Sequence, residues 1–344
     1  MPIIDIHIHG IGGHGTRGAT SRDILKIAEI HGSHGVSAII PTIYSGSIDQ
    51  MRLDIAAVKE AMEIQAAEKK SSRLEVQGSR FRKRTSIVDQ PEIVNRKSDA
   101  ETKKNIKPSA TAPEGRPRTL NIELCARVDT PATILGVHLE GPFLNPARAG
   151  ALDRKSFFSA KTSHFRKLVE GFNNVIKIIT VAPEINGATS LIRSITDTGV
   201  IVSMGHSDAT YSETEAGFNA GAKGITHIFN AMRGIHHREP GIAGFGLTNP
   251  HVYIEIIADP FHLHPKTIEL IFSMKKTEKI IIVSDSIQMA QTDSTIQGIT
   301  NPSNRLLGGS MTITESARYL ISLGFSQDII KQCIGTNPEQ YLTS

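Results

Sequence analysis

The stretch "IIDIHIHG" at residues 3–10 joins an apolar, β-branched strand to two histidines at the end of that strand. Side chains of a strand alternate between its faces, so His7 and His9 are expected to point the same way. Two imidazole nitrogens that converge on one point suit a metal ion. Two histidines with only local hydrogen bonds are the alternative, and further ligands downstream must decide between them.

Length and composition limit the kind of protein in which such ligands could occur. The chain has 344 residues, of which 39% are hydrophobic, enough to bury one large α/β core or two smaller ones. No apolar run approaches the roughly 18–20 residues that span a bilayer, and the first residues lack the pattern of a signal peptide. We therefore expect a soluble, cytoplasmic protein with no membrane partner. Two cysteines, Cys125 and Cys333, are too few for a disulfide framework or a thiolate cage, so any metal must use histidine and carboxylate.

The positive net charge comes from one segment. Residues 68–118 carry 14 Lys or Arg and seven Asp or Glu, so the rest of the chain has a net charge of −3. This segment is rich in Ser, Lys, Arg and Pro and shows no sustained helical or strand period, which predicts a disordered insertion within one domain over 1–344. A solvated loop is the favoured interpretation, and an RNA-tethering or partner-binding arm through "RFRKR" is the alternative. Nucleic acid is not the expected partner.

Strand patterns alternate with helical patterns along the rest of the chain. Helical spacing of apolar residues is found, for example, over 21–35 and 49–65. Near-continuous apolar strands that alternate with amphipathic helices predict a parallel sheet covered by helices, and eight such units match a (β/α)₈ barrel of the α/β class. An open doubly wound sheet is the alternative, but no G-x-G-x-x-G follows the first strand. The eight strand patterns lie at 3–9, 36–44, 133–141, 175–184, 199–206, 224–230, 252–259 and 279–286.

Five of these strand patterns end on, or carry, an imidazole or a carboxylate. Because the active site of such a barrel lies at the C-terminal ends of its strands, these side chains are expected to share one rim. Histidine nitrogens with a carboxylate suit zinc, iron or manganese, with open positions left for water. We expect one or two divalent ions per chain, bound by the candidate ligands His7, His9, Glu140, His206, His227 and Asp285.

Seven short motifs in this order resemble the N-acetylglucosamine-6-phosphate deacetylases of the amidohydrolase superfamily. They are "HLEGPFL" (138–144), "GHSDAT" (205–210), "THIFNAM" (226–232), "REPG" (238–241), "ADPFH" (258–262), "VSDS" (283–286) and "LGGS" (307–310). The resemblance runs from Ile3 to about Pro338, apart from the basic insertion. It implies that Glu140, His206 and His227 hold the metal common to the family, while His7 and His9 match the H-x-H of members with two metals.

The resemblance also implies a reaction, namely hydrolysis of N-acetylglucosamine 6-phosphate to glucosamine 6-phosphate and acetate in amino-sugar catabolism. A bound metal lowers the pKa of its water from 15.7 to roughly 7, and Asp285 would take that proton and pass it to the departing nitrogen. A helix-capping carboxylate is the alternative for Asp285.

Further residues are implied for the substrate. Asn230, Ala231 and His262 would contact the sugar phosphate. Arg238 would reach the phosphate held by a neighbouring subunit, which implies a homodimer, and a guanidinium suits a phosphate because it donates two parallel hydrogen bonds. A surface salt bridge for Arg238 and a polar rim position for His262 are the alternatives.

Three departures from the family pattern leave other functions open. We expect the small β-sandwich that family members build from segments on both sides of the barrel to be missing, and the basic insertion is longer than expected. Leu152 stands where the family often has a histidine that helps to bind the acetyl carbonyl. The alternatives are an amidohydrolase acting on another N-acyl sugar or a cyclic amide, and a catalytically inactive sugar-phosphate-binding protein.

Overall fold

The computed structural model describes residues 1–83, 130–292 and 297–344, without the side chains of 72–83. The chain divides into two compact units, residues 1–65 with 124–344, and residues 66–123. Residues 68–83 of the predicted insertion form the end of a helix, α2 (Ile48–Lys83). The rest of that segment, 84–118, lies outside the described residues, so the domain assignment remains a prediction.

Eight parallel strands form the centre of the first unit, in the order β1-β4-β6-β7-β8-β9-β10-β11. Each of the eight strand patterns of the sequence contributes one of them, so the predicted (β/α)₈ architecture is confirmed. A short additional strand, β5 (Thr133–Ile134), pairs with β4. The strands are β1 (Ile4–Ile8), β4 (Ala38–Tyr44), β6 (Val137–Glu140), β7 (Ile176–Val181), β8 (Ile201–Met204), β9 (Gly224–Ile225), β10 (Tyr253–Ile257) and β11 (Ile280–Val283).

The sheet closes where the last strand returns to the first. Ile8 forms a parallel bridge with Ser286, and the backbone N–H of Asp285 donates to the carbonyl of His7 at 3.0 Å. The register between β1 and β4 shifts between Asp5 and Ile8. A bulge of this kind re-aims side chains next to a site, and here it lies directly at the H-x-H.

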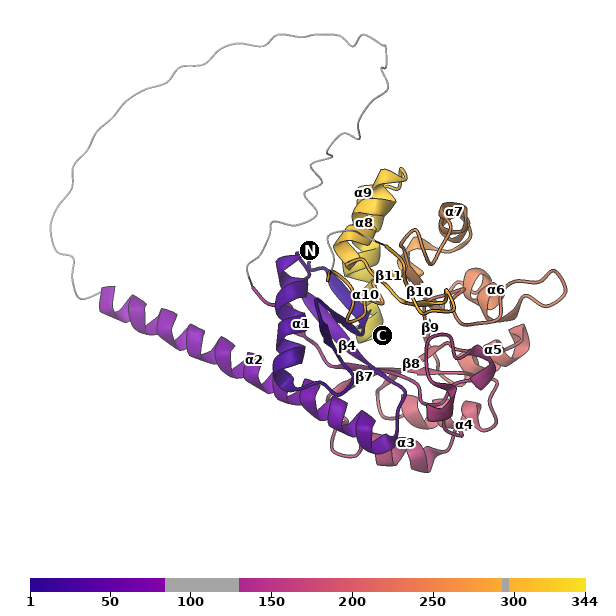
Figure 1. The fold of residues 1–344 in the computed structure, drawn as a ribbon, viewed down its shortest axis with the longest axis horizontal. Coiled ribbons are helices and arrows are strands. Elements are labelled where there is room, and N and C mark those ends of the chain that lie inside the picture. Colours follow the sequence, from indigo (N-terminus) through magenta and orange to yellow (C-terminus); the bar gives the residue numbers. More distant parts are fainter. Residues whose placement is uncertain (84–129, 293–296) are drawn as a thin grey trace, which may run out of the picture. The chain divides into compact units, whose positions relative to one another are not determined.

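Helices surround the strands (Figure 1). The first helix, α1, begins with a capping box. The Thr20 side chain accepts from the backbone N–H of Asp23, and the Asp23 side chain accepts from the backbone N–H of Thr20, so two donors are satisfied. The helix then buries Ile24, Ile27 and Ala28 at the predicted spacing. The helices are α1 (Ser21–Ser33), α2, α3 (Thr162–Val169), α4 (Ala188–Thr196), α5 (Tyr211–Asn219), α6 (Gly241–Thr248), α7 (Pro265–Met274), α8 (Ile313–Ser322), α9 (Gln327–Lys331) and α10 (Asn337–Thr343).

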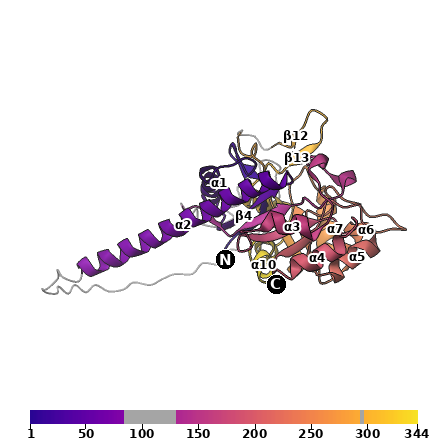
Figure 2. The same cartoon turned by 90° about the horizontal axis from the view of Figure 1, so that it is seen from below.

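Short elements complete the loops. A hairpin of β12 (Ile299–Thr300) and β13 (Leu306–Gly308) lies at one edge of the first unit (Figure 2). No helix among the described residues is long and apolar enough to cross a membrane. The other short elements are β2 (Gly10–Ile11), β3 (His14–Gly15), the 3₁₀ turns Pro146–Arg148, Arg154–Ser156 and Thr277–Lys279, and a π-helical turn at Gln332–Thr336.

Candidate active site

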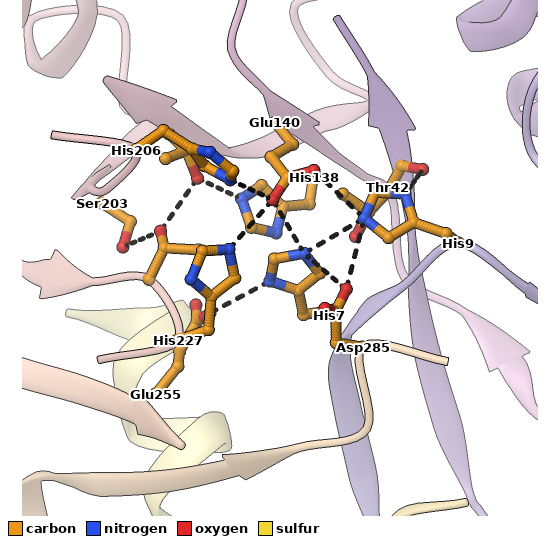
Figure 3. Close-up of polar contacts among 12 residues, drawn as sticks. His7, His9, Thr42, His138, Glu140, Ser203, His206, His227, Glu255 and Asp285 are labelled. Carbon is orange, nitrogen blue, oxygen red and sulfur yellow. Dashed lines mark hydrogen bonds and ion pairs between the residues drawn. The ribbon is translucent and has the colours of Figure 1, made fainter. Parts of the chain in front are cut away.

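The predicted rim residues lie at the C-terminal ends of five strands and point toward one another (Figure 3). Glu140 is the last residue of β6, and the others follow within two residues of a strand end, apart from His7 inside β1. His206, His227 and Asp285 have φ angles of 47°, 29° and 48°. Non-glycine residues adopt this left-handed conformation only where the surroundings enforce it, and such residues cluster at functional sites. The strand ends are thus bent so that their side chains converge.

One group of ligands comes from β1 and β11. The Nε2 atoms of His7 and His9 lie 3.3 Å apart, and each lies 3.4 Å from Oδ1 of Asp285. Both imidazoles are buried, whereas the Asp285 side chain keeps 13% of its surface exposed. Three potential ligand atoms therefore surround one point.

Glu140 joins this group to a second one. Its Oε1 lies 2.9 Å from Nε2 of His206 and 3.1 Å from Nε2 of His227, and its Oε2 lies 3.2 Å from Nε2 of His9. One carboxylate thus faces imidazoles of both groups. Zinc, iron and manganese sites often share a carboxylate in this way when two ions lie close together.

The other ring nitrogens show that these Nε2 atoms suit a cation. Nδ1 of His9 faces the carbonyl oxygen of Thr42 at 3.1 Å, and Nδ1 of His206 faces that of Arg148 at 3.0 Å. A carbonyl oxygen can only accept, so each Nδ1 carries a proton, which leaves Nε2 as the nitrogen that can offer a lone pair to a cation. These Nε2 atoms face carboxylate oxygens, and imidazole nitrogen with carboxylate oxygen is a donor set that zinc, iron and manganese accept, so the residues fit a metal.

Burial lowers the pKa of His7 and raises that of Asp285, and both shifts favour the uncharged form of the side chain. Burial lowers the pKa of His7 well below its usual range, although the Glu140 carboxylate opposes the shift, so its imidazole is neutral. Burial, followed by repulsion from Glu140 and Glu255, raises the pKa of Asp285 well above that of an ordinary carboxyl group. Asp285 therefore holds a proton more readily than a solvated aspartate does.

A second layer of polar side chains lies deeper in the barrel. Glu255, buried in the middle of β10, places Oε2 3.1 Å from Nδ1 of His7, and its Oε1 has no hydrogen-bond partner among the described residues. A carboxylate behind a ligating histidine fixes the tautomer and makes the imidazole a stronger ligand. His138 places Nε2 2.8 Å from Oγ1 of Thr180 and Nδ1 3.3 Å from the carbonyl of Ile6. With both nitrogens engaged in the barrel interior, His138 is less suited to a metal.

A cavity of about 900 Å³ opens above the candidate ligands. Leu152, in the place where a histidine was expected, is one of its apolar lining residues. The loop that carries Leu152 is held down by Arg148, which donates from Nε and Nη2 to Asp208. Other lining residues include His9, Tyr44, Glu140, His206, His227, Asn230, Ala231, Ile257, His262, Asp285 and Arg305.

Three of the four predicted substrate-binding residues line this cavity. Asn230 and Ala231 lie in the turn after β9, and His262 places Nδ1 2.8 Å from Oδ2 of Asp259. Arg238 does not line it; this residue is exposed and its Nη1 lies 3.0 Å from Nε2 of His237. Arg238 therefore does not contact the cavity of its own chain, and its predicted role toward a second subunit stays a prediction.

Three residues that support the site were not predicted from the sequence. Glu255 is the one charged residue in the run "VYIEII", and a buried charge in a strand is a detectable signal. Asp259 follows the same strand and accepts from the backbone N–H and the ring of His262. Tyr44 ends β4, so inspection of strand ends for residues other than histidine and carboxylates would have found it.

Comparison with known proteins supports the resemblance noted in the motifs. The chain is 38% identical over 166 residues to N-acetylgalactosamine-6-phosphate deacetylase of Escherichia coli O157:H7, which covers 48% of this chain and 44% of that protein. It is 41% identical over 157 residues to N-acetylglucosamine-6-phosphate deacetylase of Bacillus subtilis, which covers 46% of this chain and 40% of the relative. The matches thus span less than half of these relatives. No family model matches the chain.

Solved structures share the fold. The crystal structure of N-acetylglucosamine-6-phosphate deacetylase from Thermotoga maritima superposes with a TM-score of 0.75 at 23% identity, covering 100% of this chain and 78% of that one. At this identity the likeness concerns the architecture, and it agrees with the barrel described above.

Proposed function

We propose that this chain hydrolyses the acetamide of N-acetylglucosamine 6-phosphate, giving glucosamine 6-phosphate and acetate, with the help of divalent metal. The observation that carries the proposal is the convergence of four imidazoles on Glu140 and Asp285 at the floor of a cavity. The similarity to deacetylases of phosphorylated amino sugars supports the choice of substrate. A phosphorylated sugar is retained inside a cell by its charge, so we place the enzyme in the cytoplasm.

Two ions of zinc, iron or manganese are proposed. His7, His9 and Asp285 would hold one, because their ligand atoms lie within 4.8 Å of one another. Glu140, His206 and His227 would hold the other, because both imidazoles face Oε1 of Glu140. When bound, such an ion lowers the pKa of water from 15.7 to roughly 7 and polarises the acetyl carbonyl.

Asp285 is the proposed acid and base. Its carboxylate accepts the proton of the attacking water, and the same carboxyl group then donates that proton to the glucosamine nitrogen as the carbon–nitrogen bond breaks. Partial exposure supports this role, since the side chain must reach the substrate. Its backbone is held on both sides: the N–H donates to His7 at 3.0 Å, and the carbonyl accepts from Gly309 at 2.7 Å.

Substrate binding is assigned to the far wall of the cavity. Asn230, Ala231 and His262 would contact the sugar phosphate, and Asp259 would hold the His262 ring so that Nε2 faces the ligand. Arg238 would contribute from a second subunit of a homodimer, which its exposed position allows. A cross-linking or light-scattering measurement that finds only monomer would contradict this assignment.

N-acetylgalactosamine 6-phosphate is the second candidate substrate, because a relative of similar identity is named for that sugar. Acetate release from both sugar phosphates, measured after chelation and again after addition of Zn²⁺, Fe²⁺ or Mn²⁺, tests the reaction. We expect release that depends on metal and is faster for the glucosamine derivative. No release from either sugar under metal-replete conditions would refute the proposed hydrolysis and favour an inactive sugar-phosphate-binding protein.

A further inference from the structure

Tyr44 lies in the cavity wall directly beside a candidate metal ligand. It ends β4, and its ring stacks on the imidazole of His9 with centroids 3.8 Å apart and planes inclined by 13°. The guanidinium carbon of Arg17 lies 4.8 Å from the centroid of the same ring. These two contacts hold the phenol ring in one orientation, and Tyr44 lines the same cavity as Glu140 and Asp285.

The Tyr44 hydroxyl is available to a ligand. Across residues 1–83, 130–292 and 297–344 it has no hydrogen-bond partner. A phenol has an ordinary pKa near 10, so it carries its proton at neutral pH and can act as a donor. Tyr44 is half-buried and lines the cavity, so a hydroxyl without an internal partner is suited to a substrate atom there.

Three other potential donors in the cavity wall already have an internal hydrogen-bond partner. Arg148 donates to Asp208, and Arg305 donates from Nη1 to the carbonyl of Gly150 at 2.7 Å. His262 places Nδ1 against Asp259 and lies in the wall assigned to the sugar phosphate. Leu152 has no hydrogen to donate. Among these residues, Tyr44 alone combines a free donor with direct contact to a candidate metal ligand.

We propose that the hydroxyl of Tyr44 donates a hydrogen bond to the acyl oxygen of the substrate, making Tyr44 a catalytic residue of the proposed deacetylation. When the water oxygen bonds to the carbonyl carbon, the π electron pair moves onto the acyl oxygen. The hydrogen bond strengthens as this negative charge develops, and the proton stays on Tyr44. The pair returns when the carbon–nitrogen bond breaks, and the amine takes its proton from Asp285.

Tyr44→Phe tests the hydroxyl separately from the ring. The variant keeps the stack on His9, so metal content and unfolding temperature should equal those of the parent. Loss of one donor to an oxyanion typically costs roughly 10²- to 10³-fold in kcat, and we expect a loss near the lower value with little change in KM. Tyr211→Phe is the matched control, because Tyr211 is a half-buried tyrosine of α5 that packs on Phe245 outside the cavity. Its kcat should match that of the parent.

An N-thioacetyl substrate supplies a readout that a purely structural role would not move. Sulfur is a weak hydrogen-bond acceptor, so the parent-to-variant ratio of kcat should shrink to within a few-fold when sulfur replaces the acyl oxygen. An unchanged kcat in Tyr44→Phe, or an equal loss with both substrates, would overturn the inference. The inference rests on the proposed function, so a parent protein that releases no acetate would refute both. If the parent is active, the kcat of Tyr44→Phe tests the role of the Tyr44 hydroxyl alone.

Discussion

Replacing His31 with leucine should make the protein less sensitive to mild acid. His31 lies on α1 with none of its surface exposed, and neither ring nitrogen has a hydrogen-bond partner among the described residues. Burial, followed by repulsion from His34, lowers its pKa from 6.5 to about 3. The folded protein therefore keeps a neutral imidazole at pH values where the unfolded chain binds a proton.

The sign and size of the effect follow from this difference. Between pH 6.5 and 3 the unfolded state binds more protons, so the contribution of His31 to stability is intact above 6.5 and falls as the pH decreases. Each pH unit in this window costs about 1.4 kcal/mol, so lowering the pH to 5 removes about 2 kcal/mol. For a chain of 344 residues, with an unfolding entropy of roughly 2.1 cal/mol/K per residue, that corresponds to a decrease of roughly 3 °C in Tm.

Thermal unfolding at pH 7 and pH 5 measures this contribution. Other titrating groups act equally in parent and variant, so the difference between their Tm decreases isolates His31. His31→Leu should lose roughly 3 °C less than the parent, and at pH 7 it should be at least as stable, because leucine leaves no unpaired nitrogen. His251→Leu, at an exposed loop position, should behave like the parent. Equal decreases for parent and His31→Leu would refute the reasoning.

Three further predictions concern the candidate site. Asp285→Asn removes the proton acceptor at constant size and should lower kcat for acetate release by roughly 10²- to 10⁴-fold; unaltered turnover would contradict the assigned role. Replacing His7 and His9 together by alanine should reduce metal content from two ions per chain to about one, and a single ion in the parent would exclude the two-metal proposal. Glu255→Gln should weaken metal binding by roughly 10- to 100-fold in a chelator competition, whereas Thr180→Val in the same buried layer should not.

The repeating units of the barrel could be predicted from the sequence. In "KIIIVSDS" and "VIKIITVAPE" the apolar, β-branched residues mark strands that are buried on both faces, and burial of this kind leaves a local pattern. The rim positions follow from the same pattern, because Glu140 and Asp285 stand at strand ends. The helical extension of α2 to Lys83 was missed, since its later residues carry no apolar period.

The fold class and the set of candidate ligands can be predicted from the sequence, because strand periodicity and residue type are local properties of the chain. Which nitrogens and oxygens come into contact depends on the tertiary structure. Glu255 lies 248 positions from His7 and yet contacts its Nδ1, and Tyr44 stacks on His9 across two neighbouring strands. The register shift in β1 lies at His7, and the left-handed backbone at His206 and Asp285 lies where their side chains turn toward the site (Figure 3). Such geometry arises from barrel closure, which brings distant strands together and leaves no periodic trace in the sequence.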